Sequence, residues 1–158
     1  MCIRDRTIGV VSGVLGIRWF DCTVTGMEAH AGPTPMALRK DALLAATRIM
    51  QDVVAAAHRH PPHGRGTVGM VQVFPNSRNV IPGRIKFSID LRNSTDTLVD
   101  AMAAEVKAFA DQVAKEHGVQ VHIEMVSSYP AQLFQPECVQ AVGPVSYTHL
   151  TLPTILLV

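Results

Sequence analysis

The feature that most constrains the fold of this chain is the strict alternation of side chains over residues 84–92. Apolar residues occupy every second position, and polar or charged residues stand between them; the apolar set is Ile85, Phe87, Ile89 and Leu91, and the polar set is Arg84, Lys86, Ser88, Asp90 and Arg92. Successive side chains of a β-strand point to opposite faces of a sheet. One face of this strand is therefore expected to be buried and the other exposed, as in an antiparallel sheet covered on one side.

Further strands and two helices are expected around it. Period-two alternation predicts strands over 16–25, 67–74 and 119–126, the last with Val121, Ile123 and Met125 pointing inward. Helical spacing predicts one helix over 35–57, capped by Thr34, and a second that follows Ser94 or Thr95 and ends at Gly118. The expected buried stripes are Leu43, Ala46, Met50, Val53, Val54 and Ala57 in the first, and Leu98, Met102, Val106, Phe109 and Val113 in the second.

The element order is β-α-β-β-α-β, which defines the expected fold class. This is the split βαβ, or ferredoxin-like, arrangement of the α+β class. It predicts a four-stranded antiparallel sheet with two helices on one face.

Composition excludes several classes of protein. With 158 residues, 47% hydrophobic and 17% charged, the chain is long and apolar enough for a folded core. A formal net charge of +1 gives no strong positive potential that would attract nucleic acid. No apolar segment is long enough for a transmembrane helix. Three cysteines, Cys2, Cys22 and Cys138, show no disulfide or zinc-knuckle spacing, which favours the reducing cytoplasm.

Both ends of the chain fit this domain poorly. We expect residues 1–6 and 145–158 to be non-native, residues 7–130 to form the domain, and residues 131–144 to begin a return to a further domain. The last segment has no usable hydrophobic period.

A glycine- and proline-rich segment over 26–36 holds the first candidate for chemistry. Glycine and proline fix an ordered loop here, and His30 is its one side chain suited to proton chemistry near neutral pH. Read alone, the segment is more simply interpreted as a plain strand-to-helix connection that contains a histidine. A second histidine group, His58, His60 and His63, lacks acidic or cysteine companions and is interpreted as a solvated helix end.

Asn79 and Arg92 are the other candidates. Asn79 lies in Ser-Arg-Asn-Val-Ile-Pro-Gly, and Arg92 ends Asp-Leu-Arg. Their plain interpretations are a turn-forming asparagine and a surface arginine beside Asp90.

Together these motifs resemble the hydantoinase/carbamoylase family. The matching segments are Gly-x-x-Ala-His-Ala-Gly-x-Thr-Pro-Met at 26–36, Asn-Val-Ile-Pro-Gly at 79–83 and Asp-Leu-Arg at 90–92, and the similarity extends over about residues 8–141. The family comprises N-carbamoyl-L-amino-acid hydrolases, allantoate amidohydrolases and β-ureidopropionases. The resemblance is to the inserted lid and dimerisation domain of these enzymes alone.

The resemblance implies a metal-dependent hydrolase of linear amide C–N bonds as the parent protein, with two divalent ions, zinc or manganese, held by ligands outside this chain. It implies a homodimer and a small carboxylate substrate. His30 would stabilise the oxyanion in the partner subunit's site, and Asn79 and Arg92 would bind the substrate carboxylate. This fragment alone would bind no metal and be inactive. The alternatives are the same domain of a related peptidase or aminoacylase, or a non-catalytic dimerisation module.

Overall fold

The computed structural model describes residues 10–142 and divides them between two compact units. The larger unit is Leu15–Ala131 and contains the expected sheet and both long helices. The expected non-native ends, 1–6 and 145–158, lie outside the described residues. No helix among the described residues is long and apolar enough to cross a membrane.

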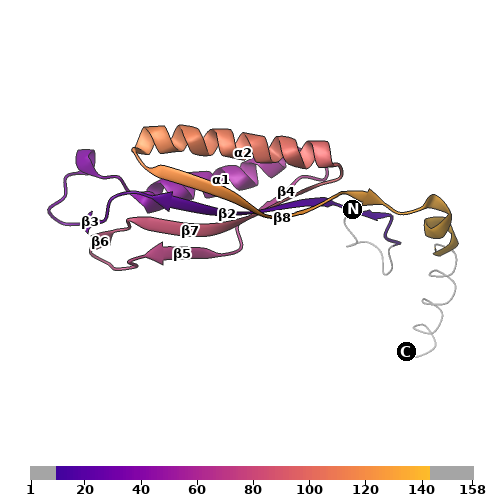
Figure 1. Ribbon diagram of the computed structural model, residues 1–158, viewed down its shortest axis with the longest axis horizontal. Helices are drawn as coiled ribbons and strands as arrows, with labels where there is room; N and C mark the ends of the chain where they lie inside the picture. The colour runs from indigo at the N-terminus through magenta and orange to yellow at the C-terminus, as the bar shows by residue number, and fades with distance from the viewer. Residues whose placement is uncertain (1–9, 143–158) are drawn as a thin grey trace, which may run out of the picture. The chain divides into compact units, whose positions relative to one another are not determined.

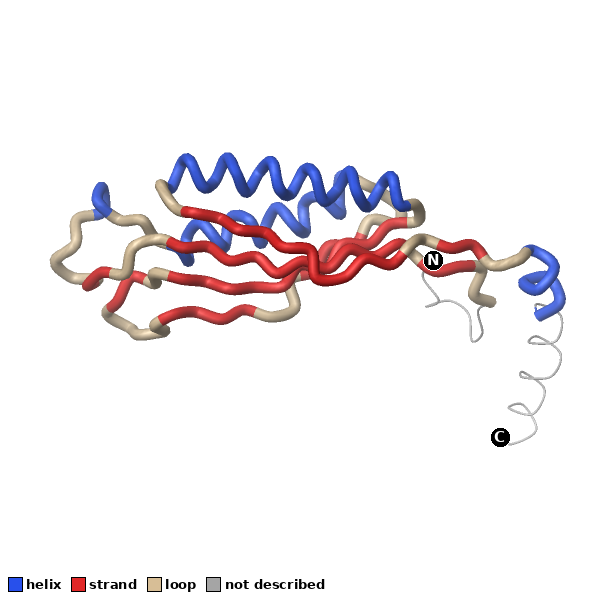
Figure 2. The backbone as a smooth tube through the Cα atoms, in the orientation of Figure 1, coloured by secondary structure: helices blue, strands red, loops and turns tan. Residues whose placement is uncertain are grey.

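The larger unit is an antiparallel sheet covered by two helices on one face (Figures 1 and 2). Its strand segments are β2 (Gly16–Thr25), β4 (Arg65–Thr67), β5 (Val71–Phe74), β7 (Arg84–Asn93) and β8 (Gln120–Tyr129). The order across the sheet is β4-β7-β2-β8, and β5 pairs with the same edge of β7 as β4 does. The predicted α+β fold class is confirmed.

A separate pair of short strands lies beyond one end of β2 and β7. These are β3 (Ala29–His30) and β6 (Val80–Ile81), which pair antiparallel with His30 opposite Val80. The smaller unit contains β1 (Gly13–Val14) paired with β9 (Gln132–Leu133), and residues 136–142 are helical.

The predicted strand over 67–74 is wrong in one respect, because it is interrupted. Ser88 of β7 donates its N–H to the Met70 carbonyl at 3.1 Å, and its Oγ accepts from the Met70 N–H at 3.0 Å. The hydroxyl thus takes a ladder position between β4 and β5. Alternation alone could not show that a partner side chain would replace the backbone.

The first long helix begins later than predicted. A short 3-10 helix, η2 (Met36–Leu38), precedes α1 (Ala42–Arg59), and Arg39 between them is extended. Asp41 caps α1 by accepting from the N–H groups of Leu43 and Leu44 at 2.9 and 3.1 Å. Thr34 is therefore not the cap.

The second helix, α2 (Asp96–His117), has the predicted start and end. Thr95 caps it through its hydroxyl, and Gly118 ends it with a φ of 63°, where glycine is favoured. The predicted stripes were partly out of phase, because Val54 and Leu98 are exposed. The buried positions include a row of alanines on α1, which lets the helix lie close to the sheet; those on the two helices are Ala42, Ala45, Ala46, Ile49, Asp52, Val53, Ala56, Val99, Met102, Ala103, Val106, Ala110 and Val113.

The sheet side of the core matches the alternation. Ile85, Phe87, Ile89 and Leu91 of β7 are buried with Phe20, Cys22 and Val24 of β2. On β8, however, Met125 is half exposed, contrary to the prediction. Met125 pairs with the buried Phe20 and so lies on the helix-covered face, but β8 is an edge strand of the sheet, which leaves this side chain partly open to solvent.

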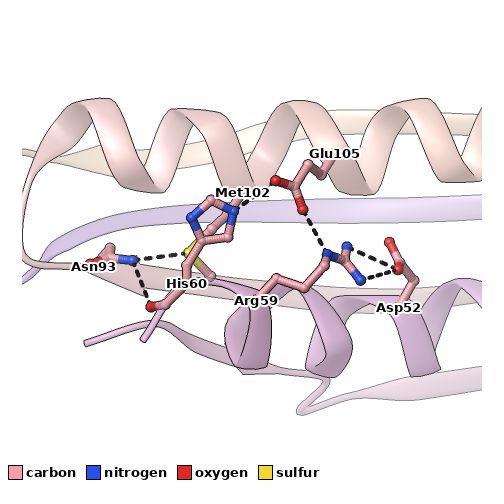
Figure 3. A network of polar contacts seen from close by, with 6 residues as sticks. All are labelled: Asp52, Arg59, His60, Asn93, Met102 and Glu105. Carbon is pink, nitrogen blue, oxygen red and sulfur yellow. Dashed lines mark hydrogen bonds and ion pairs between the residues drawn. The ribbon is translucent and has the colours of Figure 1, made fainter. Parts of the chain in front are cut away.

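A polar network joins the end of α1 to α2 (Figure 3). Arg59 donates to Asp52 and to Glu105, and His60 Nε2 lies 2.7 Å from Glu105 Oε1. Asn93, at the end of β7, reaches the His60 carbonyl. The interpretation of the histidine cluster as a solvated helix end is therefore wrong for His60, whose side chain is only 15% exposed.

Candidate functional site

His30 is the last residue of β3, which pairs with β6 beyond one end of the main sheet (Figure 1), and its side chain is exposed. The Gly32 N–H donates to His30 Nδ1 at 3.0 Å. A neutral imidazole that accepts at Nδ1 carries its proton on Nε2. The exposed ring therefore presents an Nε2–H donor to the outside.

Two features hold this loop in place. The Arg39 guanidinium donates to the Ala31 carbonyl at 2.7 Å and to the Thr34 carbonyl at 3.0 Å. A Cβ on Gly32 would lie 3.3 Å from the His30 ring, tighter than most real contacts. A side chain at position 32 would therefore displace the imidazole by a few tenths of an ångström.

Asn79 lies on the segment directly beside His30. Its carbonyl accepts from the Ala31 N–H at 2.8 Å, and its side-chain Oδ1 accepts from the Ser77 hydroxyl at 2.9 Å. Because Oδ1 is engaged, the side-chain Nδ2 group is the one available to donate to an anion. The structure therefore brings His30 and Asn79 to the same end of the unit.

Arg92 lies near the other end of β7, opposite Ile17 of β2 and Arg65 of β4. Asp90 binds its Nε at 3.0 Å and its Nη2 at 2.7 Å, and this hydrogen bonding raises the pKa of the guanidinium above its usual value. Asp90 thus occupies the Nε–Nη2 edge. Among the contacts of the described residues none uses Nη1, so the outer edge of the fork is open to a carboxylate.

The three predicted site residues do not converge within one chain. From Arg84, near the His30 loop, to Arg92 the strand extends roughly 26 Å at about 3.3 Å per residue. No small anion spans that distance. Any single site that contains all three groups must combine residues of two copies.

The described residues offer no metal centre. No three His, Cys, Asp or Glu side chains between residues 10 and 142 are placed to hold a metal ion. The part of the chain that the structure describes therefore does not fit the two divalent ions that the resemblance implies, and ligands for them would have to come from elsewhere.

Comparison with known proteins identifies the family. A family model described as the peptidase dimerisation domain matches residues 12–118. The chain belongs to this family. An N-carbamoyl-L-amino-acid amidohydrolase from Rhizobium meliloti is 37% identical over 94% of this chain and 37% of its own length. An allantoate amidohydrolase from Bacillus subtilis is 33% identical over 77% of this chain and 30% of its own.

Solved structures of relatives of this peptidase dimerisation domain agree. An amidase of the hydantoinase/carbamoylase family from Burkholderia multivorans has 45% identity and a TM-score of 0.87 over 90% of this chain and 35% of its own. The predicted resemblance to that family is confirmed. The chain spans about a third of the length of the relatives that it matches.

Sequence reasoning missed two residues that position the candidates. Asp90 was noted only as a neighbour of Arg92, although alternation places both side chains on one face two residues apart. Arg39 had no sequence signal, because its role depends on how the loop folds back over it.

Proposed function

We propose that this chain is the lid and dimerisation segment of a hydrolase that cleaves linear amide C–N bonds in N-carbamoyl or ureido carboxylates. Family membership and the names of the relatives support the reaction class. The observation that carries the proposal is the hydrogen bond from the Gly32 N–H to His30 Nδ1, which leaves Nε2 of the neutral ring to carry the proton.

His30 would act where negative charge develops. When water attacks the carbonyl carbon of the substrate, charge grows on the carbonyl oxygen, and a donor held at that place lowers the barrier by about 3 kcal/mol. A neutral imidazole with its proton on Nε2 supplies such a donor. The metal ions that the resemblance implies would activate the water; their ligands are not among the described residues.

Arg92 and Asn79 would bind the substrate carboxylate from two copies. The open edge of Arg92 matches a carboxylate with two parallel hydrogen bonds. Because Asn79 lies with His30 at the other end of the unit, the proposal requires a homodimer in which the His30 loop of one copy reaches the Arg92 end of its partner. A location in the cytoplasm stays a prediction.

A chimeric enzyme tests the proposal. Residues 15–131 replace the matching segment of the Rhizobium meliloti N-carbamoyl-L-amino-acid amidohydrolase, and hydrolysis is followed with and without a metal chelator. We expect a dimer that hydrolyses N-carbamoyl-L-amino acids and loses this activity with the chelator. A folded dimer without hydrolysis would contradict the proposal, and hydrolysis of dipeptides alone would favour the related peptidase.

A further inference from the structure

A hollow of about 330 Å³ opens on the sheet face opposite the helices, where the ladder between β4 and β5 is interrupted. Four strands, β2, β4, β7 and β8, and the loop between β4 and β5 contribute its walls, which include Trp19, Thr67, Met70, Ser88, Asp90 and Val126. The hollow exists because residues 68–70 leave regular pairing with β7.

The walls are mainly apolar and exposed. Trp19 is 39% exposed, Met70 64% and Val126 58%. Large apolar side chains that gather on a surface mark a place where something binds, whereas isolated ones need no explanation. Trp19 makes an edge-to-face contact with Tyr129, with ring centroids 6.0 Å apart, which favours one orientation of the indole.

The hollow adjoins Arg92. Asp90 lines it and also binds the Arg92 guanidinium at 2.7 Å. In the register of β2 and β7, Trp19 lies opposite Asp90 and Ile17 opposite Arg92. Two residues along a strand cover about 6.6 Å, which is within reach of a group bonded to the carbon next to a carboxylate held by Arg92.

We propose that this hollow binds the apolar side chain of the substrate and selects for it. The inference rests on the proposed function, in which Arg92 binds the substrate carboxylate. The substituent on the adjacent carbon then lies against Trp19, Met70 and Val126. Burying an aliphatic or aromatic group there removes apolar surface from water on both partners.

Charge complements this choice. The two carboxylates at the hollow, Asp21 and Asp90, already have cationic partners in Lys86 and Arg92. An anionic side chain would find no unpaired cation among the lining residues and two carboxylates nearby. The preferred class is therefore N-carbamoyl amino acids with aliphatic or aromatic side chains, over acidic ones and over glycine.

The chimeric enzyme described above tests this selection. Met70→Ala and Val126→Ala remove wall atoms, and Val54→Ala, at an exposed valine on the helix side, is the matched control. kcat/KM is measured for N-carbamoyl-L-leucine and N-carbamoylglycine. We expect each wall variant to lower the value for leucine by about tenfold, with glycine changed less than about twofold and the control unchanged for both.

The outcomes separate the two proposals. An active chimera whose preference for leucine over glycine is the same in the wall variants would overturn the hollow as a side-chain site, while leaving the reaction intact. A folded but inactive chimera would contradict the proposed function.

A second readout does not need activity. Trp19 is the one tryptophan of the 158-residue chain, so its fluorescence reports on the hollow directly. Titration of the 158-residue chain with N-carbamoyl-L-leucine should give a saturable change in Trp19 fluorescence. N-carbamoylglycine should not produce this change, and Met70→Ala should weaken it. Equal responses to the two compounds, or none, would overturn the inference.

Discussion

The two ends of strand β7 hold their candidate groups in different ways. At the Arg84 end, His30 and Asn79 lie on short strands and loops fixed by backbone hydrogen bonds, outside the main sheet. At the other end, Arg92 belongs to the ladder itself and is held by a carboxylate of its own strand. The exposed loop can change without loss of the core, whereas Arg92 cannot be removed without leaving Asp90 unpaired.

This difference fits a division of labour. A donor on an exposed segment outside the main sheet can reach into another subunit, because it is not covered by the rest of its own chain. A guanidinium fixed in a ladder is preorganised and loses little entropy when a ligand binds. Four substitutions, in the chimeric enzyme where activity is measured, test this comparison.

The largest effect is expected from His30→Ala. Loss of the Nε2–H donor should lower kcat by about 10²- to 10³-fold with little change in KM. Because His30 is exposed, the melting temperature should not change. His58→Ala, another exposed histidine, is the control. A kcat near that of the unmodified chimera would remove the oxyanion role.

Arg92→Lys should act mainly on binding. Lysine keeps the charge but loses the planar fork, so KM should rise by about 10- to 100-fold, with a smaller change in kcat. Arg84→Lys, at the opposite end of the same strand, is the control and should leave KM unchanged. An unaltered KM in Arg92→Lys would count against carboxylate binding by this residue.

Gly32→Ala tests whether the loop positions the ring. A Cβ 3.3 Å from the imidazole should push His30 aside and lower kcat by about tenfold, because small misplacements of a catalytic group are costly. Steady-state kinetics and thermal unfolding check this. Unchanged kcat would mean that the loop adapts and that the ring is not preorganised.

The smallest effect, on stability, is expected from Glu105 of α2, which contacts Arg59 and His60 at the end of α1. Hydrogen bonds from His60 and Arg59 lower the pKa of Glu105 below its usual 4.5. The carboxylate therefore contributes stability above that pH, and the contribution is lost as pH falls through the lowered pKa. Glu105→Gln should lower the melting temperature by about two degrees at neutral pH.

The same variant should match the unmodified 158-residue chain at strongly acidic pH. Thermal unfolding of both proteins across the pH range measures the difference. A difference in melting temperature that grows as pH falls would contradict this prediction and show that Glu105 does not act as a paired carboxylate.

Much of the fold was predictable because local patterns and tertiary packing agree. Strand β2 has the predicted bounds, and the apolar side of β7 is buried as its alternation indicates. The start of α1 was not predictable from Thr34, because Asp41 caps the helix instead. The carbonyl of Thr34 accepts a hydrogen bond from the Arg39 guanidinium, in the loop before the helix. Alanines blurred the phase of its buried face, since they fit either side of a helix.

The candidate site divides in a similar way. Sequence motifs identified His30, Asn79 and Arg92, but motif order along a chain carries no distance between residues on opposite ends of a sheet. The hollow beside Arg92 had no sequence signal, because Trp19, Met70 and Val126 come from separate segments.

By itself the sequence determined the α+β fold class, the one-sided sheet and the family, since hydrophobic period and short motifs act locally. Only the tertiary structure decided that His30 and Asn79 lie together while Arg92 lies far from them. It also decided that Asp90 binds one edge of the Arg92 guanidinium and leaves the other edge open. Strand pairing sets these relations, because register joins residues that the chain keeps far apart.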